Sequence, residues 1–456
     1  MTRIAPLPYC ADPGQIFEAV ADLPWSVLLD SGPHERGQSR YDIIVAQPWA
    51  TLVTRAGTSE VRTRTGVRTS GDDPFQLLRE LLQPFASAAS PAPFAGGAIG
   101  YFGYDLGRRL ERLPCLARDD EQLPQLAVGL YDWAVVIDHQ RHEAWLASAG
   151  RVPDTERQWP VLVERFGRPA VGGSRAPFRT LSSIRSNFTR SQYLAAFERV
   201  ARYIDAGDCY QVNLAQRFEA RASGDPWSAY QALRAVNPAP HAAYLNLPFA
   251  QVLSASPERF LHVREGQVET RPIKGTRARA ADPRLDAERA LELRASVKDR
   301  AENVMIVDLL RNDLAKSCRP GSIRVPRLFE VESFASVHHL VSTVNGELAA
   351  GRDALDLLRG CFPGGSITGA PKLRAMQIIE ELEPHRRGVY CGSIGYVGYD
   401  GSMDCNIAIR TLVYREGYAR FWAGGGIVAD SVGEDEYQET LDKARPFFQV
   451  MEKAGK

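Results

Sequence analysis

The chain contains 456 residues, of which 44% are hydrophobic and 24% charged, and its 55 basic and 55 acidic residues balance to a formal net charge of zero. This composition is typical of a globular protein with a large core, and it provides no bulk charge to hold a nucleic acid or a membrane surface. Seven cysteines without a CxxC pair indicate reduced thiols and a cytoplasmic compartment, not a disulfide frame or a zinc site. No apolar run reaches the roughly 18 residues of a membrane span, and the N-terminus lacks the apolar core of a signal peptide.

The first part of the chain is predicted to be rich in β-strands. β-branched and aromatic residues lie between turn signals in four segments, WSVLLDS (25–31), YDIIVA (41–46), ATLVTRAG (50–57) and DWAVVID (132–138). Gly, Pro, Ser and Arg are concentrated in residues 166–187, which we interpret as a linker or surface loop. We therefore expect an N-terminal region over 1–165 and a catalytic region over 188–456.

The second part of the chain mixes helices with strands. Apolar residues at helical spacing predict a helix over 191–207 that ends at Gly207, and a strand is predicted over 211–220. The charged stretch 281–317 is predicted to be a long helical region with one break. Runs of strands with interspersed long helices indicate an α+β fold with large, mainly antiparallel β-sheets and outer helices.

One short segment occurs twice in the chain. GAIGYFGYD (97–105) and GSIGYVGYD (392–400) match at seven of nine positions. Either two similar strand-and-turn solutions have arisen by chance, or equivalent strands occur in two related sheets. A single echo does not indicate a repeat protein.

Two predicted helices carry carboxylates in positions that suit a divalent cation. Glu302 lies in line with Ile306 and therefore borders the apolar face of its helix. Glu436 and Glu439 lie at i, i+3 on one side of a second helix. Oxygen ligands of this kind suit Mg²⁺, whereas an i, i+4 ion pair between Glu439 and Lys443 on a solvated helix is the alternative.

Two glycine-rich segments are candidates for binding an anion. FPGGSITGAPKLRAMQIIEEL (362–382) is a loop that enters a helix with Pro371 near its first turn, where free N–H groups and the helix dipole suit a carboxylate or phosphate. The GK[ST] ending of a P-loop is absent from it. WAGGGIVADS (422–431) sets three glycines after a strand, where the backbone can approach a ligand closely. A tight turn is the alternative for both segments.

For three further polar residues, the neighbouring sequence alone does not indicate a functional role. Lys274 in RPIKGTRAR (271–279) is, on these residues alone, best explained as a solvated lysine at a turn. His338 and His339 are expected on opposite faces of a strand, so that one points inward. A buried, hydrogen-bonded structural histidine is the default for that position, and a contact to substrate is the alternative.

Taken together, these segments resemble one family, the chorismate-utilising enzymes, which include anthranilate synthase component I, aminodeoxychorismate synthase component I, and the isochorismate and salicylate synthases. The resemblance covers nearly the whole chain and implies an anthranilate synthase component I-like fold. It rests on motifs that occur in the family's order, PWSVLLDSG, GAIGYFGYD, ASPERF, RPIKGTRAR, KDRAENVMIVDLLRNDL, HHLVSTVNGEL, FPGGSITGAPK, GSIGYVGYDG, NIAIRT, AGGGIVADS and EYQETLDKAR.

The resemblance implies Mg²⁺-dependent chemistry on chorismate and assigns roles to residues of this chain. Glu302 and Glu439 fall on the family's metal ligands, with Glu436 near the metal or its waters. His339 falls on a histidine near the chorismate ring, and Glu258 of ASPERF falls on the general acid that helps expel the C4 hydroxyl. The residues that would meet the substrate's carboxylates are Gly275, Thr276, Tyr390, Arg410, Gly424, Gly425, Gly426 and Lys443.

Two positions discriminate between branches of the family. The anthranilate branch usually reads PIAGT, whereas Lys274 makes this chain similar to the aminodeoxychorismate branch, in which the lysine amine attacks C2 of chorismate and ammonia then attacks C4. The water-using branch has a lysine base where this chain has Gln211, which argues for an amine nucleophile. The implied product is 4-amino-4-deoxychorismate, on the route to p-aminobenzoate and folate, with ammonia supplied by a separate glutamine amidotransferase subunit.

The resemblance also suggests a tryptophan site in the first part of the chain. PWSVLLDSG corresponds to the segment that binds regulatory tryptophan in anthranilate synthases, with Asp30 in place of a glutamate. Some aminodeoxychorismate synthases keep a bound tryptophan there as a structural element. A plain β-strand in a sheet is the alternative. The candidate residues are Ser31, Arg40, Tyr41, Pro240, His241 and Ala242.

Replacing Lys274 by Ala tests the role that the resemblance gives this residue. A lysine at its ordinary pKa of about 10.4 is mostly protonated, so a nucleophilic role requires burial or a nearby cation to lower that pKa. We expect Lys274→Ala to lose most aminodeoxychorismate formation while folding stays intact, as measured by turnover of chorismate with ammonia and Mg²⁺. Unchanged activity would exclude a covalent role. The rival readings are an anthranilate synthase subunit with an atypical lysine and a non-catalytic binding subunit.

Overall fold

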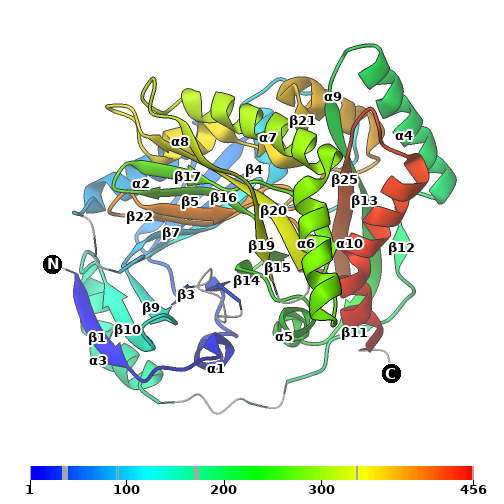
Figure 1. Cartoon of the computed structure of the whole chain (residues 1–456). Coiled ribbons are helices and arrows are strands. Elements are labelled where there is room, and N and C mark those ends of the chain that lie inside the picture. The colour runs from blue at the N-terminus through cyan, green and yellow to red at the C-terminus, as the bar shows by residue number, and fades with distance from the viewer. Residues whose placement is uncertain are drawn as a thin grey trace.

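A computed structural model describes residues 2–32, 40–88, 90, 92–168, 173, 175–334 and 337–453. Two large sheets dominate it, and each pairs its neighbouring strands antiparallel (Figure 1). The main path of the 13-stranded sheet runs β1 (Arg3–Leu7), β10 (Glu143–Ser148), β9 (Trp133–Asp138), β3 (Tyr41–Val45), β2 (Ser26–Asp30), β14 (His241–Leu247), β15 (Ala250–Ser256), β24 (Thr411–Arg415), β25 (Tyr418–Ile427), β13 (Gln211–Ser223) and β11 (Arg179–Thr180). The short strands β12 (Arg185–Ser186) and β21 (Gly369–Ala370) also pair with β13.

The second sheet has 12 strands, and both sheets draw strands from each side of residues 166–187. Its main path runs β18 (Ile273–Ala278), β20 (Val337–Glu347), β17 (Gln267–Thr270), β16 (Arg259–Arg264), β23 (Met403–Asn406), β22 (Ser393–Gly398), β7 (Gly97–Phe102), β8 (Leu126–Tyr131), β4 (Ala50–Arg55), β5 (Thr58–Thr63) and β6 (Gly66–Ser70). Strand β19 (Arg324–Ser333) pairs with β20. The two regions that the sequence suggested therefore share both sheets.

The two sheets pack face to face, and the side chains along each strand point alternately into this interface and toward an outer face. Val27 of β2 joins Ile99 and Tyr101 of β7 in a cluster between the sheets. The residues next to them in sequence, Leu28 and Phe102, point to opposite outer faces and join separate clusters. Successive side chains of a strand point to opposite sides of a sheet, so strands buried on both faces are apolar throughout.

Helices cover the two outer faces and complete an α/β/β/α arrangement. The cluster on the outer face of the 13-stranded sheet includes residues of α1 (Pro13–Phe17), α3 (Pro153–Phe166), α5 (Pro226–Val236) and α10 (Gly433–Lys453). The cluster on the outer face of the second sheet includes residues of α2 (Pro74–Leu82) and α8 (Ala354–Cys361). Within the described residues, no helix is long and apolar enough to cross a membrane.

Most predicted elements of the catalytic region are present. The helix predicted over 191–207 is α4 (Arg190–Asp205), and the strand predicted over 211–220 is β13. The charged stretch 281–317 forms α6 (Pro283–Ala295) and α7 (Val297–Ala315). Its single break falls at Ser296, whose ψ of 115° is not helical and whose side chain accepts a hydrogen bond from the N–H of Asp299, so that this residue caps α7.

The two copies of the repeated segment are neighbours in one sheet. Strands β7 and β22 pair antiparallel, with Gly97 opposite Gly398 and Gly100 opposite Gly395. The suggestion that they occupy equivalent strands of two related sheets is therefore wrong. A Cβ built on Gly100 would lie 2.1 Å from the carbonyl oxygen of Ala127, which explains a glycine at this tightly packed position.

The predicted linker contributes structure to the sheet edge. Its short strands β11 and β12 pair with β13, while residues 169–172 and 174 lie outside the described residues. The division of the chain at 166–187 remains a prediction about chain organisation, since the sheets do not separate there.

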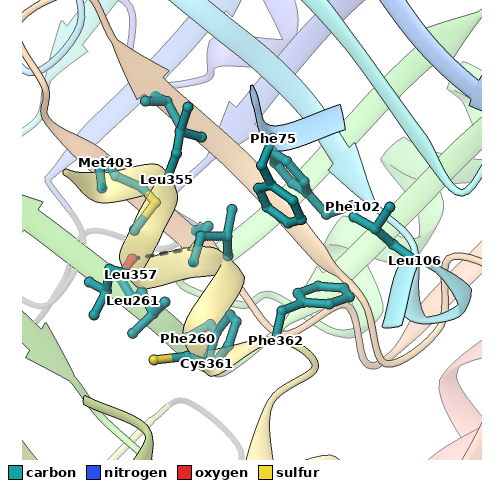
Figure 2. Packing of buried hydrophobic residues seen from close by; sticks show 14 of the residues in the cluster. Phe75, Phe102, Leu106, Phe260, Leu261, Leu355, Leu357, Cys361, Phe362 and Met403 are labelled. Atoms are coloured by element: carbon teal, nitrogen blue, oxygen red, sulfur yellow. Dashed lines mark hydrogen bonds between the residues drawn. The ribbon is translucent and has the colours of Figure 1, made fainter. Parts of the chain in front are cut away.

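The core on the outer face of the second sheet offers a test of packing. Figure 2 shows Leu357 of α8 beside Leu261 of β16, and Leu357 is fully buried. We expect Leu357→Ala to reduce the free energy of unfolding by about 2–5 kcal/mol, because it removes buried methyl groups and leaves a cavity. Denaturant unfolding measures this change. Leu291→Ala on α6, where the residue is 65% exposed, serves as the control and should stay within about 0.5 kcal/mol of the parent protein. Equal losses in the two variants would contradict this packing.

Candidate active site

The candidate site forms where one end of each sheet meets two helices. Strands β18 and β20 of the second sheet pack against α7, and β25 packs against α10, which runs alongside β25 in Figure 1. Lys274 lies on β18, His339 on β20 and Glu302 on α7, while α10 carries Glu436 and Glu439. Segments distant in the sequence thus bring together the residues that were predicted to act together.

Lys274 is half-buried within a field of mixed charge. Burial lowers the pKa of its amine, and the cation of Lys443 lowers it further, while the carboxylates of Glu302, Glu258 and Glu439 oppose this change. The net pKa is below the ordinary value, so the neutral, nucleophilic form is more accessible than in an exposed lysine. The lysine lies on a strand, and the solvated-turn alternative is wrong.

Glu258 has the protonation behaviour of a general acid. It follows β15 and is only 6% exposed. Burial raises the pKa of its carboxyl group to about 7, although a hydrogen bond from Ser366 and the cations of Lys274 and Lys443 favour the ionised form. A carboxyl group with a pKa near neutrality holds a proton that it can donate.

Both histidines of the pair are buried, contrary to the expectation that one points inward. His339 Nδ1 lies 2.9 Å from the Thr276 hydroxyl, and burial together with the Arg410 cation lowers the pKa of His339 to about 3. The ring is therefore neutral. His338 lies 3.0 Å from the Asp286 carboxylate of α6. This helix covers the side of the strand that was expected to face solvent.

Arg410 and Tyr390 are suited to bind an anionic substrate. The Arg410 guanidinium donates to Asn237 Oδ1 at 3.1 Å, and among the described residues no carboxylate lies within ion-pair distance of it. Burial lowers the pKa of Arg410, which is the cost of a charge without a counter-ion. Tyr390 is buried and stacks on Trp422 with ring centroids 5.9 Å apart, and burial raises the pKa of its phenol, which therefore stays protonated.

The glycines of β25 leave space in front of the carboxylates of α10. A Cβ built on Gly425 would lie 2.7 Å from Glu436 Oε2 and 3.4 Å from Glu439 Oε1. The carbonyl oxygen of Gly424 accepts a hydrogen bond from Lys443 Nζ at 2.8 Å. A side chain at Gly425 would therefore fill the space that a ligand of these carboxylates needs.

At two other positions, neighbouring side chains lie so close to the backbone that only a glycine fits. Gly275 has a φ of +85°, and a Cβ there would lie 2.9 Å from the Asp299 carboxylate. A Cβ on Gly426 would lie 2.8 Å from Gln211 Nε2. Gln211 is fully buried, and its Oε1 has no hydrogen-bond partner among the described residues. This buried acceptor is thus left unsatisfied beside Gly426.

The acidic residues fit Mg²⁺ in their chemistry. Glu436 Oε1 accepts from the Ser431 hydroxyl at 2.7 Å, while its Oε2 is buried without a partner in the part of the chain that the structure describes. Glu439 is paired with Lys443 at 2.5 Å, and burial raises the pKa of Glu302. No three acidic, His or Cys side chains of the described residues converge on a ready metal site. An unpartnered carboxylate oxygen beside a second carboxylate is nevertheless the kind of donor that Mg²⁺ takes.

The six candidate tryptophan-site residues line one cavity of about 140 Å³ away from these groups. The N–H and the hydroxyl of Ser31 both donate to Asp42 Oδ1 at 2.7 Å. Arg40 pairs with Asp138 at 2.8 Å and its guanidinium lies over the Tyr41 ring. Sequence reasoning thus located residues that the fold brings together.

Sequence reasoning missed several residues around the site. Ser366 hydrogen-bonds Glu258, and the cation of Lys298 acts on Glu302, Glu436 and Glu439. The i, i+4 spacing of Lys298 and Glu302 could have revealed the interaction between these two residues. Nothing in the local sequence HRRG (385–388) indicated the contacts of Arg387, which lies behind the site.

The distribution of charge defines the class of protein. Among the described residues the Arg410 guanidinium has no carboxylate partner, the glycine-rich strand lies beside two neighbouring carboxylates, and an amine and a proton donor share one electrostatic field. Such a site suits an enzyme that binds a small anionic substrate and donates a proton to it.

The chain belongs to the family described as chorismate binding enzyme, whose sequence pattern matches residues 29–449. Aminodeoxychorismate synthase component 1 of Klebsiella aerogenes is 50% identical over 450 residues, which cover 98% of each chain. Anthranilate synthase component 1 of Thermus thermophilus is 43% identical over 436 residues, covering 94% of this chain and 93% of the relative. The crystal structure of anthranilate synthase component I from Streptococcus pneumoniae matches with a TM-score of 0.80 and 32% identity, covering 89% of this chain and 92% of that chain. The expected family and fold are confirmed.

Glu258→Gln provides a test through pH. Because the pKa of Glu258 rises from 4.5 to about 7 on folding, the parent protein loses stability as pH rises from about 4.5 through about 7. A glutamine does not ionise, so the free energy of unfolding of the variant should rise relative to that of the parent protein, by up to about 3 kcal/mol, as the pH rises from about 4 to about 8. Turnover should fall about 100-fold or more, since no proton donor remains. Urea unfolding and initial rates measure the two effects.

Glu265→Gln, at the exposed turn between β16 and β17, is the matched control. Its stability should follow the parent protein across the same pH range, because its carboxylate is solvated. A pH-independent difference between the parent and Glu258→Gln would contradict the burial argument.

Proposed function

We propose that this chain converts chorismate and ammonia to 4-amino-4-deoxychorismate, as the first component of a synthase that serves p-aminobenzoate and folate formation. The observation that carries this proposal is the position of Lys274, half-buried beside Glu258 and Glu302, where burial lowers the pKa of its amine. The anthranilate branch usually has an alanine at this position. Relatives named aminodeoxychorismate synthase component 1 at 48–50% identity support the same branch.

The residues of the site suggest a two-step displacement. The Lys274 amine attacks C2 of chorismate, both conjugated ring double bonds shift, and the C4–O bond breaks as Glu258 donates a proton, so that water leaves. The lysine nitrogen then passes a proton to the Glu258 carboxylate. Ammonia attacks C4, both double bonds shift back, and the C2–N bond breaks with its electron pair on the Lys274 nitrogen, which takes up the proton that the new amine loses. His339, neutral because it is buried, contributes no charge beside the ring.

Binding of the substrate would rely on a guanidinium without a carboxylate partner among the described residues, on a buried phenol and on the glycine backbone of β25. Arg410, the phenol of Tyr390 and the backbone of Gly424–Gly426 would hold the carboxylates of chorismate, with Lys443 close by. Glu302, Glu436 and Glu439 would hold Mg²⁺, which when bound would neutralise negative charge on the substrate. Gly275 and Thr276 complete the substrate side near His339.

Ammonia would come from a separate glutamine amidotransferase, as the name of component 1 in the relatives implies. Gln211 supports an amine nucleophile, because a neutral amide cannot act as the base that water activation requires. The cytoplasmic compartment remains a prediction from the cysteines.

The cavity near Ser31 supports a second binding role, for a tryptophan. The walls of the cavity combine apolar residues with the Arg40 and Tyr41 side chains, which suit an aromatic amino acid. Asp30 is occupied within the protein by the N–H of Gly32 at 2.8 Å and by the Tyr230 hydroxyl at 3.1 Å. The ligand's amino group would therefore be recognised mainly by other acceptors of the cavity.

Product analysis tests the proposed function directly. Purified protein supplied with chorismate, Mg²⁺ and ammonia should form a product that an added aminodeoxychorismate lyase converts to p-aminobenzoate. Chromatography with mass detection follows both compounds. Fluorescent anthranilate with release of pyruvate would identify an anthranilate synthase instead. Absence of any chorismate turnover would favour a non-catalytic subunit.

A further inference from the structure

Arg387 forms a buried junction behind the candidate site. Its side chain is 1% exposed and pairs with Glu383, Nε to Oε2 at 2.9 Å and Nη2 to Oε1 at 2.6 Å. Nη1 also donates to the carbonyl oxygen of Ile367, and Nη2 to that of Asn213, both at 2.9 Å. One guanidinium therefore joins the end of helix α9 (Lys372–Leu382), the glycine-rich loop and strand β13.

Strand β13, which Arg387 contacts at Asn213, is the first link from this junction to the strand that carries the glycines. Asn213 and Ala215 of β13 pair with Gly426 and Gly424 of β25. The N–H of Ala215 donates to Glu383 Oε1 at 2.9 Å, so the ion pair holds β13 through a donor and an acceptor. The ion pair therefore supports the strand that pairs with the glycines, although neither Arg387 nor Glu383 is among the predicted substrate contacts.

The glycine-rich loop is held in the same way. Asn213 Nδ2 donates to the carbonyl oxygen of Ser366 at 3.0 Å, and Arg387 holds the next residue, Ile367. Ser366 in turn hydrogen-bonds the carboxyl group of Glu258. The ion pair thereby supports the loop that orients the proposed proton donor.

Tyr390 is the third link. The Arg387 guanidinium carbon lies 5.8 Å from the centroid of the Tyr390 ring, within the range of a cation–π contact. Trp422 of β25 stacks on the same ring nearly parallel, at 7°. The ring that would present its phenol to a substrate carboxylate is therefore restrained by both neighbours.

We propose that Arg387, with Glu383, is a positioning residue for chorismate binding, acting through Tyr390 and the strand that carries the glycines; this rests on the proposed function. A buried ion pair is often no better for stability than apolar residues of similar volume, so stability alone does not account for it. Its planar fork pairs with both oxygens of Glu383 and reaches two separate backbone segments at the same time, a fixed geometry that the rotatable ammonium of a lysine lacks.

A double-mutant cycle tests the proposal. We expect Arg387→Met to raise the KM for chorismate about tenfold with a smaller change in kcat, because ground-state and transition-state binding are lost together. In the Tyr390→Phe background, the same substitution should raise KM by a smaller factor than it does in the parent protein, since residues that act as a unit are not additive. Arg387→Lys, which keeps the charge, should restore part of the loss.

Arg108→Met is the control, because Arg108 is a mostly buried arginine paired with Asp105 and Glu380 outside the site. Calorimetric titration with chorismate and Mg²⁺ measures affinity without turnover, so a failure of the proposed reaction remains distinguishable from a failure of positioning. Independent, multiplying effects of Arg387→Met and Tyr390→Phe, or equal losses of affinity in the Arg387 and Arg108 variants, would overturn the proposal. If Arg387→Met does not fold, the same cycle with Arg387→Lys decides.

Discussion

The packing of the two antiparallel sheets against each other is the constraint on which the rest of the molecule depends. Side chains from both halves of the chain, among them Val27, Ile99 and Val252, meet in the layer between the sheets. Neither half can bury these residues alone, because each sheet is completed by strands of the other half. The burial of this layer therefore sets where the sheets end and brings β18 and β20 into position relative to β13 and β25.

Function depends on the separation of charge at those ends. Among the described residues, Arg410 has no carboxylate counter-ion and Glu436 has a carboxylate oxygen without a hydrogen bond. Both arrangements cost folding free energy, because buried polar groups are stable only when paired. A substrate with carboxylates and a divalent cation would satisfy them, as the proposed function requires.

The environment of Lys274 shows why the same residue type can be inert or reactive. Burial and Lys443 lower the pKa of its amine, while three carboxylates act in the other direction. Glu258, which shares this electrostatic field, has its pKa raised by burial. The two pKa values move toward one another, so the neutral amine and the protonated carboxyl group are each more accessible than in exposed residues.

The sequence by itself determined the α+β class, most strands and helices, the presence of one break in the helical stretch 281–317 and the family, because these depend on local periodicity and on ordered motifs. Through the resemblance it also predicted a set of site residues, whose roles stay predictions. Only the tertiary structure decided that the two glycine-rich echoes are neighbours in one sheet and that His338 is covered by Asp286. It likewise revealed that Arg387 joins a helix, a loop and a strand. These features require contacts between residues distant in the chain, and local patterns carry no information about such partners.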